Sequence, residues 1–396
     1  MNLTNFFSTL CIALLIWSCG DKETDDPNPT DLPRLNISSI TLFEGDENNV
    51  FSFKIATSAA FDQAIKVDYT TEEVTAAEGT DFVSNSGTIT IAPTEREAFI
   101  EVEIVGDTIK ESDEVFKLVL SNPVNATIFE SEGIGTIRND DTFIFVPEDG
   151  YITPDNYTGY SLAWADEFEG TSINTSDWTH ELGNSGWGNN EWQYYTNRTE
   201  NSFISDGSLV IEAKEENYNG ANYTSARMIT QNKQLFRFGR IDIRAILPEG
   251  QGIWPALWML GTNISDIGWP ACGEIDIMEL VGHEPGKIHG TAHWGAQGQG
   301  YSNNAGNAYQ LQSGKFSDEY HVFSIIWEPD QMTWMVDDNV YFVLGNADIQ
   351  ESYPFNEEFF FIFNIAVGGN WPGYPDASTQ FPQRMIVDYI RVFEKN

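Results

Sequence analysis

The sequence predicts an all-β protein that contains two successive β-sandwiches. Apolar residues recur at every second position in short runs, and turn residues separate these runs at intervals of about ten residues. No long amphipathic helix and no strand–helix alternation interrupts the runs, which argues against a parallel α/β sheet. The 396 residues exceed one ordinary core, so we expect two folded domains with additional terminal segments.

The N-terminal segment has the features of an export signal. Residues 5–17, NFFSTLCIALLIW, form an apolar run that is short for a membrane span and typical of the central region of a signal peptide. The tetrapeptide IWSC resembles a bacterial lipobox, in which cleavage leaves Cys19 at the new N-terminus and lipidated. We therefore expect a lipoprotein signal peptide over 1–18. An ordinary secretory signal with an incidental cysteine is the alternative.

Residues 19–34 form an acidic, Pro-rich stretch without hydrophobic periodicity, which predicts a flexible tether. An acidic stretch directly after a lipidated cysteine resembles the surface-export signal of Bacteroidetes lipoproteins. The resemblance implies an extracellular protein that is held at the outer membrane surface by a lipid on Cys19.

The overall charge excludes some partners. Sixty acidic and 20 basic residues give a formal net charge of −40, which makes nucleic acid a poor partner because phosphate binding needs basic contacts. Two interpretations of the acids stay open, namely solubility alone and metal binding by some of them. Outside the N-terminal segment the chain has one cysteine, Cys272, so no disulfide framework is expected there. We expect Cys272 to pack as a small apolar residue.

Residues 35–141 are expected to form the first sandwich, because their runs place alternate apolar residues on one face. These residues are Phe51, Phe53 and Ile55, then Ile65, Val67 and Tyr69, then Ile100, Val102 and Ile104, and finally Phe116, Leu118 and Leu120.

Acids cluster at the ends of these predicted strands, where loops of a sandwich converge. The order of the motifs FEGD, GTDF, VGDTIKESDE and RNDD resembles the Calx-β domain, a calcium-binding sandwich of Ig-like type. The resemblance implies six candidate Ca²⁺ ligands, and solvated turn acids are the alternative. The candidates are Glu44, Asp81, Asp107, Glu114, Asp140 and Asp141.

Residues 142–155 are expected to link this domain to a second one over 156–396. The second domain is rich in Trp, Gly and Asn, and its alternating runs include SLVIEAK, GRIDIRAIL and FFFIFNIAV. One large two-sheet sandwich fits these runs better than a barrel of parallel strands.

The stretch CGEIDIMELVG carries three acids in a strand that otherwise appears buried. Strand residues alternate faces, so Glu274 and Asp276 share one face and Glu279 falls on the other. Glycoside hydrolysis needs one carboxylate at the anomeric carbon and one carboxylic acid at the leaving oxygen. A β-bulge near 277–278 would return Glu279 to the face of the other two acids. Asp276 would then hold a proton or hydrogen bond between the two Glu and keep their pKa values apart.

WPACGEIDIMELVG resembles the active-site strand of glycoside hydrolase family 16, in the laminarinase (endo-β-1,3-glucanase) branch. Supporting motifs occur in order, among them WADEFEG, GWGNNEWQYYT, YTSARMIT, GIWPALWMLG, GTAHWG and FNIAVGGNWPG. The family implies a concanavalin-like β-jelly-roll sandwich that needs no cofactor for catalysis. It also implies Glu274 as nucleophile, Glu279 as general acid/base, Asp276 as their assistant and retention of the β configuration. His293 should lie on the neighbouring strand within reach of the acids, and a purely structural histidine is the alternative.

Aromatic and polar residues are candidates for substrate binding. Trp254 and Trp258 share one strand face, where burial in the core or stacking on sugar rings would explain them. Trp269 is similar to a cleft tryptophan of laminarinases, and Asn190 and Arg227 match positions that hydrogen-bond sugar hydroxyls. We expect the donors of Arg227 to serve hydroxyls, because a glucan cleft offers no anionic group.

The family resemblance also leaves open a structural Ca²⁺ on the convex side of the second domain. The matching positions are Glu167, Gly207 and Asp388.

The sequence thus favours a monomeric, secreted endo-β-1,3-glucanase that acts on laminarin-type glucan. Two alternatives stay open. One is a hydrolase of the same family that acts on mixed-linkage glucan, agar or carrageenan, and the other is a non-catalytic β-glucan-binding surface lipoprotein.

Overall fold

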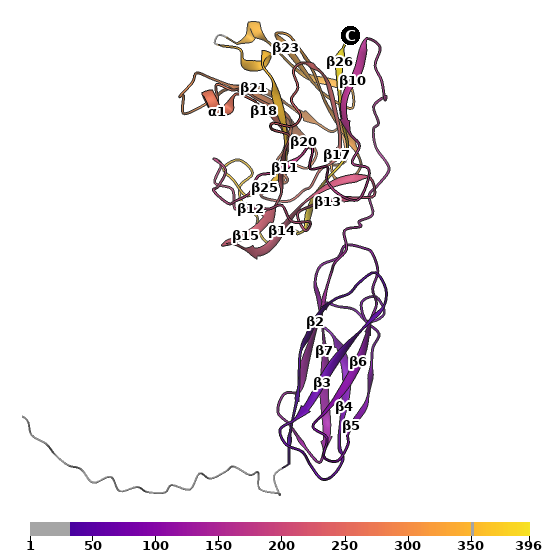
Figure 1. Ribbon diagram of the computed structural model, residues 1–396. Coiled ribbons are helices and arrows are strands. Elements are labelled where there is room, and N and C mark those ends of the chain that lie inside the picture. The colour runs from indigo at the N-terminus through magenta and orange to yellow at the C-terminus, as the bar shows by residue number, and fades with distance from the viewer. Residues whose placement is uncertain (1–31, 350–351) are drawn as a thin grey trace, which may run out of the picture. The chain divides into compact units, whose positions relative to one another are not determined.

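The structure, a computed structural model, describes residues 32–349 and 352–396 and confirms the all-β fold class (Figure 1). Within these ranges the helical elements are short. They are α1 (Ile264–Ile267) and the 3-10 turns η1 (Asn346–Asp348) and η2 (Pro354–Asn356). The expected signal peptide, Cys19 and most of the expected tether lie outside the described residues.

The chain divides into two compact units. The first extends to Gly106 and resumes over Asp113–Arg138, and the second comprises Asp107–Ser112 and Asn139–Asn396. The segments 107–112 and 139–141, which the sequence assigned to the first sandwich, therefore belong to the second unit.

The first unit is a sandwich of a four-stranded and a five-stranded sheet. The four-stranded sheet has the order β6-β3-β1-β8, with β1 (Arg34–Ile37), β3 (Asn49–Thr57), β6 (Glu97–Ile104) and β8 (Thr127–Ile128). The five-stranded sheet has the order β2-β9-β7-β4-β5, with β2 (Ile40–Phe43), β4 (Ile65–Glu73), β5 (Ser86–Ile91), β7 (Glu114–Val124) and β9 (Glu132–Arg138).

Alternation along these strands builds the core of the first unit. Phe51 and Phe53 of β3 and Phe116 of β7 are fully buried in one apolar cluster, as their spacing predicts. Phe116 stacks on Phe82 with ring centroids 4.7 Å apart. Gly135 of β9 lies against the same ring, and a Cβ at this position would be 2.4 Å from it, so only glycine fits there.

The second unit is a larger sandwich. Its ten-stranded sheet has the path β12-β15-β14-β26-β17-β22-β23-β24, with β10 beside β26 and β13 beside β14. These strands are β10 (Tyr160–Asp166), β12 (Gln193–Tyr195), β13 (Ser202–Ser205), β14 (Ser208–Tyr218), β15 (Ala221–Ser225), β17 (Gly239–Ile246), β22 (His321–Glu328), β23 (Gln331–Val336), β24 (Asn339–Gly345) and β26 (Gln383–Lys395).

The opposing seven-stranded sheet has the order β11-β16-β25-β18-β19-β20-β21. Its strands are β11 (Thr179–His180), β16 (Arg227–Ile229), β18 (Ile253–Gly261), β19 (Glu274–Leu280), β20 (Lys287–Trp294), β21 (Asn303–Gln310) and β25 (Phe359–Val367).

One apolar cluster fills the space between these two sheets. Leu257 and Ile275 of the seven-stranded sheet and Ile241 and Phe323 of the ten-stranded sheet are fully buried in it. Cys272 is a free, fully buried thiol in a smaller apolar cluster, as expected. Because aliphatic residues of the seven-stranded sheet point inward, the residues between them face outward, and these include the candidate catalytic acids.

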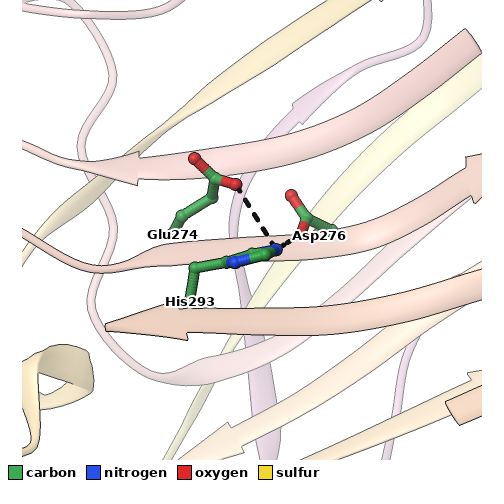
Figure 2. Close-up of side chains that lie close together, drawn as sticks. All are labelled: Glu274, Asp276 and His293. Carbon is green, nitrogen blue, oxygen red and sulfur yellow. Dashed lines mark ion pairs between the residues drawn. The ribbon is translucent and has the colours of Figure 1, made fainter. Parts of the chain in front are cut away.

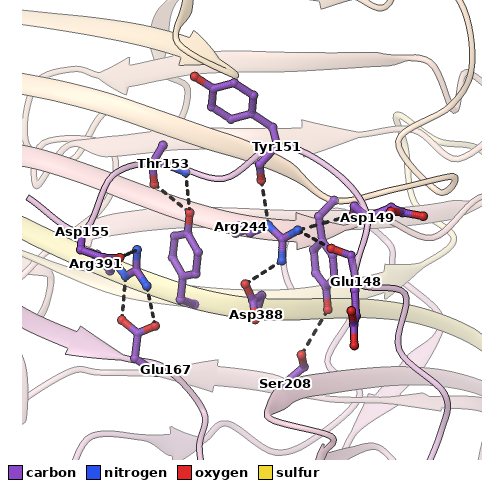
Figure 3. A network of polar contacts seen from close by, with 12 residues as sticks. Glu148, Asp149, Tyr151, Thr153, Asp155, Glu167, Ser208, Arg244, Asp388 and Arg391 are labelled. Carbon is purple, nitrogen blue, oxygen red and sulfur yellow. Dashed lines mark hydrogen bonds and ion pairs between the residues drawn. The ribbon is translucent and has the colours of Figure 1, made fainter.

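Residues 148–155, here called the strap, lie along the ten-stranded sheet of the second unit (Figure 3). The guanidinium of Arg244 is buried beneath the strap and donates from Nε to the carbonyl of Tyr151 at 2.8 Å and from Nη2 to that of Glu148 at 3.1 Å. The hydroxyl of Tyr389 accepts from the backbone N–H of Thr153 at 3.1 Å. The segment expected only to connect two domains is therefore hydrogen-bonded into the second one.

Candidate active site

The strand β19 carries a bulge at the position that the sequence predicts. Against β20, Asp276 pairs with Thr291 and Glu279 with His289, so three steps on β19 match two on β20. Against β18, Met278 pairs with Leu257 and Asp276 with Trp258, which leaves Ile277 as the extra residue. An extra residue reverses the alternation of whatever follows it. The bulge thus turns Glu279 to the face that carries Glu274 and Asp276.

Asp276 lies at the centre of the site, with His293 beside it on β20 (Figure 2). The Nε2 atom of His293 is 3.4 Å from Oδ2 of Asp276 and 3.8 Å from Oε1 of Glu274. The other ring nitrogen, Nδ1, is 2.9 Å from the hydroxyl of Ser302, which fixes the ring plane. His293 therefore reaches the acids from the neighbouring strand, as expected.

The backbone below Asp276 is held by a core tryptophan. The indole N–H of Trp334 donates to the carbonyl oxygen of Asp276 at 2.9 Å. Gly290 on β20 makes room for this ring, because a Cβ there would lie 2.6 Å from it. A hydrogen bond to a carbonyl next to the bulge fixes the irregular part of the strand from the core side.

Two tryptophans donate hydrogen bonds to the two outer acids. The indole N–H of Trp269 lies 3.0 Å from Oε2 of Glu274, and that of Trp254 lies 3.0 Å from Oε1 of Glu279. For Trp254 the sequence analysis considered core burial and stacking on sugar, and it did not predict this hydrogen bond to Glu279. Each Glu thus has its own neutral donor.

The carboxyl groups have raised pKa values. Burial raises the pKa of Glu274 to about 8, with a further rise from Asp276, whereas His293 and the Trp269 hydrogen bond lower it. Burial likewise raises the pKa of Asp276 to about 8. Burial raises the pKa of Glu279 well above its usual range, and the charges of both Asp276 and Glu274 add to the rise. Because Glu279 is next to both other acids, it keeps its proton when Glu274 ionises.

Arg227 and Trp258 lie together on one side of the acids. The guanidinium of Arg227 is 4.8 Å from the ring centre of Trp258 and 4.9 Å from that of Trp187. Its Nε donates to Glu181 at 2.5 Å. The expectation that Arg227 has no anion to pair with is therefore wrong, because Glu181, directly after β11, lies beside it. Its remaining donors are the ones that sugar hydroxyls could use.

Asn190 lies in the loop before β12, in a left-handed backbone conformation with φ 58°. Its side chain donates to Oδ1 of Asn370 at 2.9 Å. The loop after β25 that contains Asn370 also carries Trp371, which is 42% exposed. Its ring lies edge to face with that of Trp254, with the ring centres 5.5 Å apart. The ring of His289 also packs against Trp371, with the ring centres 5.0 Å apart. Sequence reasoning missed Trp371 and His289, although the motifs GGNWPG and KIHG contain them.

The acid cluster also has the spacing of a metal site. Glu274, Asp276 and His293 offer ligand atoms that all lie within 4.8 Å of one another. The bulge and the tryptophan donors also place these groups for acid–base chemistry.

On the opposite sheet, the three positions matched to a convex Ca²⁺ site already have partners or lie in turns. Glu167 receives two hydrogen bonds from Arg391, at 2.7 and 2.8 Å, and Asp388 pairs with Arg244 at 2.8 Å (Figure 3). Gly207 forms the turn between β13 and β14 with φ 72°. The guanidinium groups reduce the negative charge that these acids offer to a cation.

The acids of the Calx-β-like segment are distributed over both units. In the first unit, Asp81 and Glu114 offer oxygen atoms within 4.8 Å of each other, and Glu44 is buried after β2. In the second, Asp140 and Asp141 are similarly close. Asp107 accepts the backbone N–H of Ile109 at 2.6 Å and so closes a local turn.

The described residues contain no helix that has both the length and the apolar character to cross a membrane. Cys19, the predicted lipidation site, lies outside the described residues.

A β-sandwich whose outer sheet face carries two carboxyl groups, one of which keeps its proton, has the groups that glycoside hydrolysis requires. Comparison with known proteins gives the same class. Residues 189–391 match the family model of the glycosyl hydrolases family 16, and residues 30–140 match that of the Calx-beta domain.

Individual relatives agree. The chain is 40% identical to a beta-glucanase of Rhodothermus marinus, over 59% of this chain and 85% of that protein. It is 38% identical to glucan endo-1,3-beta-glucosidase A1 of Niallia circulans, over 62% of this chain and 39% of that protein. Among solved structures, the laminarinase catalytic domain of Thermotoga maritima is 48% identical, with a TM-score of 0.56, over 60% of this chain and 99% of that domain. The chain therefore belongs to glycoside hydrolase family 16.

Proposed function

We propose that this glycoside hydrolase is a retaining endo-β-1,3-glucanase that acts on laminarin-type glucan. The names of the relatives support the substrate, since a glucan endo-1,3-beta-glucosidase and a laminarinase are 38% and 48% identical to the chain. The observation that carries the mechanism is the shifted register of β19, which turns Glu279 to the face of Glu274.

In the first step, ionised Glu274 attacks the anomeric carbon and forms a glycosyl–enzyme ester. Glu279 gives its proton to the glycosidic oxygen as the bond between that oxygen and the anomeric carbon breaks. In the second step, Glu279, now a carboxylate, takes a proton from water while the water oxygen attacks the anomeric carbon and releases Glu274. Two inversions leave the product in the β configuration.

Asp276 and His293 lie beside the two glutamates and influence their protonation. When Asp276 is ionised, it favours the protonated form of Glu279, and when it is protonated, it can donate to Glu274. The Nε2 atom of His293 lies 3.4 Å from Oδ2 of Asp276, so the imidazole is a polar group beside that carboxylate. The N–H of Trp269 stabilises the ionised form of Glu274, which the attack requires.

Release of reducing sugar from laminarin, lichenan, agarose and carrageenan by the full chain tests the substrate. We expect oligosaccharides from laminarin as the main products, and preferential degradation of agarose or carrageenan would contradict the proposal. Glu274→Ser should abolish release while laminarin binding persists. Binding without any hydrolysis by the unmodified chain would instead favour the glucan-binding alternative.

We further propose that the protein acts outside the cell, held by a lipid on Cys19. The support is the apolar run followed by IWSC and an acidic stretch. Detergent phase partition of the expressed protein tests this placement. The unmodified chain should enter the detergent phase and Cys19→Ser should stay in the aqueous phase, whereas equal partition of both would contradict the lipid anchor.

We propose a structural Ca²⁺ in the first unit, because Asp81 and Glu114 offer oxygen atoms within 4.8 Å of each other and Ca²⁺ binds carboxylate oxygens. Calcium should raise the melting temperature of the unmodified chain, and Asp81→Asn should remove most of that gain. An unchanged melting temperature in calcium and in chelator would contradict the proposal.

A further inference from the structure

A fourth carboxyl group lies buried on the substrate side of the second unit, apart from the catalytic acids. Glu191, in the loop before β12, is 9% exposed. It accepts hydrogen bonds from the side chains of Gln193 at 2.7 Å, Asn189 at 3.1 Å and Tyr195 at 3.2 Å. Burial raises the pKa of Glu191, and these three donors and the charge of Arg227 oppose the rise. An ionised carboxylate only accepts hydrogen bonds, so three donors directed at Glu191 favour its ionised form.

From Glu191 a chain of hydrogen bonds leads to a candidate sugar platform. The hydroxyl of Tyr195 donates to Glu191 and accepts from the amide of Asn364 on β25 at 3.2 Å. The amide oxygen of Asn364 in turn accepts the indole N–H of Trp258 at 2.8 Å. Tyr195 is fully buried and Asn364 is 5% exposed, so no bulk water competes for these bonds. The orientation of Trp258 is thus tied to Glu191 through two side chains.

A second arm leads from Glu191 to the loop that follows β25. Gln193 donates to Glu191 through Nε2, and its Oε1 accepts the backbone N–H of Val367, the last residue of β25, at 2.7 Å. Asn189, which also donates to Glu191, accepts the backbone N–H of Asn370 through its carbonyl at 2.9 Å. The two loops that carry Asn190 and Trp371 are therefore joined around the same carboxylate.

We propose that Glu191 is a positioning residue of the glucan groove. Its ionised carboxylate orders the donors around it, so that Trp258, Asn190 and the loop of Trp371 meet the polysaccharide in fixed orientations. It does not touch the reacting atoms, whose acids lie on β19. The inference rests on the proposed glucanase function for its substrate, and its effect appears in substrate binding rather than in the chemical step.

Steady-state kinetics of Glu191→Gln in the full chain test the proposal. Glutamine has nearly the same shape but presents an NH₂ donor to the donors of Gln193 and Asn189, so the network must rearrange. We expect KM for laminarin to rise about tenfold while kcat changes less than about twofold, which is the signature of lost binding that is equal in ground and transition states. Tyr195→Phe breaks only the arm to Trp258 and should raise KM by a smaller factor.

Glu212 provides the matched control. It is 1% exposed and pairs with Arg384 in the ten-stranded sheet, away from the acids. Glu212→Gln should lower the melting temperature and leave KM unchanged, which separates general destabilisation from positioning. If Glu191→Gln does not fold, Tyr195→Phe alone decides the question.

Two results would overturn the proposal. One is an unchanged KM in folded Glu191→Gln or, where that variant does not fold, in Tyr195→Phe. The other is a loss of kcat at constant KM, which would place Glu191 in the chemistry. If the unmodified chain prefers another polymer, the proposed substrate fails, and the same KM comparison on that polymer still tests Glu191.

Discussion

Glu279 lies opposite His289 on β20, although in an unbroken antiparallel ladder its distance from Asp276 would place it opposite Ile288. The difference of one residue decides which way the carboxyl group points, because strand residues alternate between the core and the outer face. The bulge therefore brings Glu279, which would otherwise lie on the opposite face of β19, to the face of Glu274 and Asp276.

Deletion of Met278 tests whether the alternation of side chains along β19 decides the orientation of Glu279. The deletion leaves one residue between Asp276 and Glu279, so a regular strand would still present Glu279 on the outer face. We expect a folded variant that retains measurable glucanase activity, although loss of a fully buried side chain lowers its stability by about 2–5 kcal/mol. Circular dichroism and reducing-sugar release measure both properties.

Deletion of Ile275 is the matched control, since Ile275 is equally buried in the same strand. This deletion puts Glu274 and Asp276 on opposite faces and should reduce activity by about a thousandfold or more, the scale of losing a catalytic group. If the Met278 deletion folds but is as inactive as the Ile275 deletion, alternation does not explain the site.

Trp269→Phe and Trp254→Phe should shift opposite limbs of the pH–activity profile. Each removes an N–H donor that stabilises a carboxylate, so each raises the pKa of its partner acid. Trp269→Phe should move the acidic limb of kcat/KM upward by about one pH unit or less, because Glu274 must be ionised for attack. Trp254→Phe should move the alkaline limb upward, because Glu279 must be protonated. A shift of the same limb in both variants would contradict the assignment of roles.

Glu274→Gln should stabilise the protein at alkaline pH. The pKa of Glu274 is about 8 in the folded state against an ordinary 4.5, so between these values the folded state holds a proton that the unfolded state releases. The stability from this group is complete below about pH 4.5 and is lost as pH rises through about 8. We expect the free energy of unfolding of the variant to exceed that of the unmodified chain by about 1 kcal/mol or more at pH 8. At pH 4 the two free energies should differ little.

Denaturant unfolding at the two pH values measures this difference. Glu328→Gln is a control, because Glu328 forms an ion pair with Lys395 on the surface of the opposite sheet. A stability difference for Glu274→Gln that does not change with pH would contradict the raised pKa.

Arg244→Ala should destabilise the second unit without changing substrate binding. The side chain is 4% exposed and pairs with Asp388 while it donates to the carbonyls of the strap. Its loss leaves these acceptors without their donor, which costs about 3 kcal/mol or more. The melting temperature should fall, and KM measured well below it should stay unchanged. A raised KM at unchanged stability would show that the strap acts on the cleft instead.

Much of this arrangement could be predicted from the sequence. The alternating runs predict the strands, and the odd spacing of Glu279 predicts the bulge, because parity is a local property of the chain. The roles of Trp254 and Trp269 as hydrogen-bond donors to the acids could not be predicted in this way. Such contacts depend on how strands and loops distant in sequence come together.

The contacts of Arg227 and of the strap could not be predicted from the sequence for the same reason. Glu181, the ion-pair partner of Arg227, follows the two-residue strand β11. Arg244 and Tyr389, which hydrogen-bond the strap, come from two strands far along the chain. No periodicity links these residues, so only the folded sheet order brings them together.

Azide rescue of two variants tests the central claim most directly, namely that Glu274 and Glu279, which share one face of the sheet, act on opposite sides of one anomeric carbon. The substrate is an activated aryl β-laminaribioside. Glu274→Ala should yield the α-glycosyl azide, because azide takes the place of the missing nucleophile and a single displacement inverts the anomeric centre. Glu279→Ala should yield the β-glycosyl azide, because azide attacks the ester on Glu274. Proton NMR of the anomeric centre distinguishes them. A β-azide from Glu274→Ala, or an α-azide from Glu279→Ala, would contradict the account.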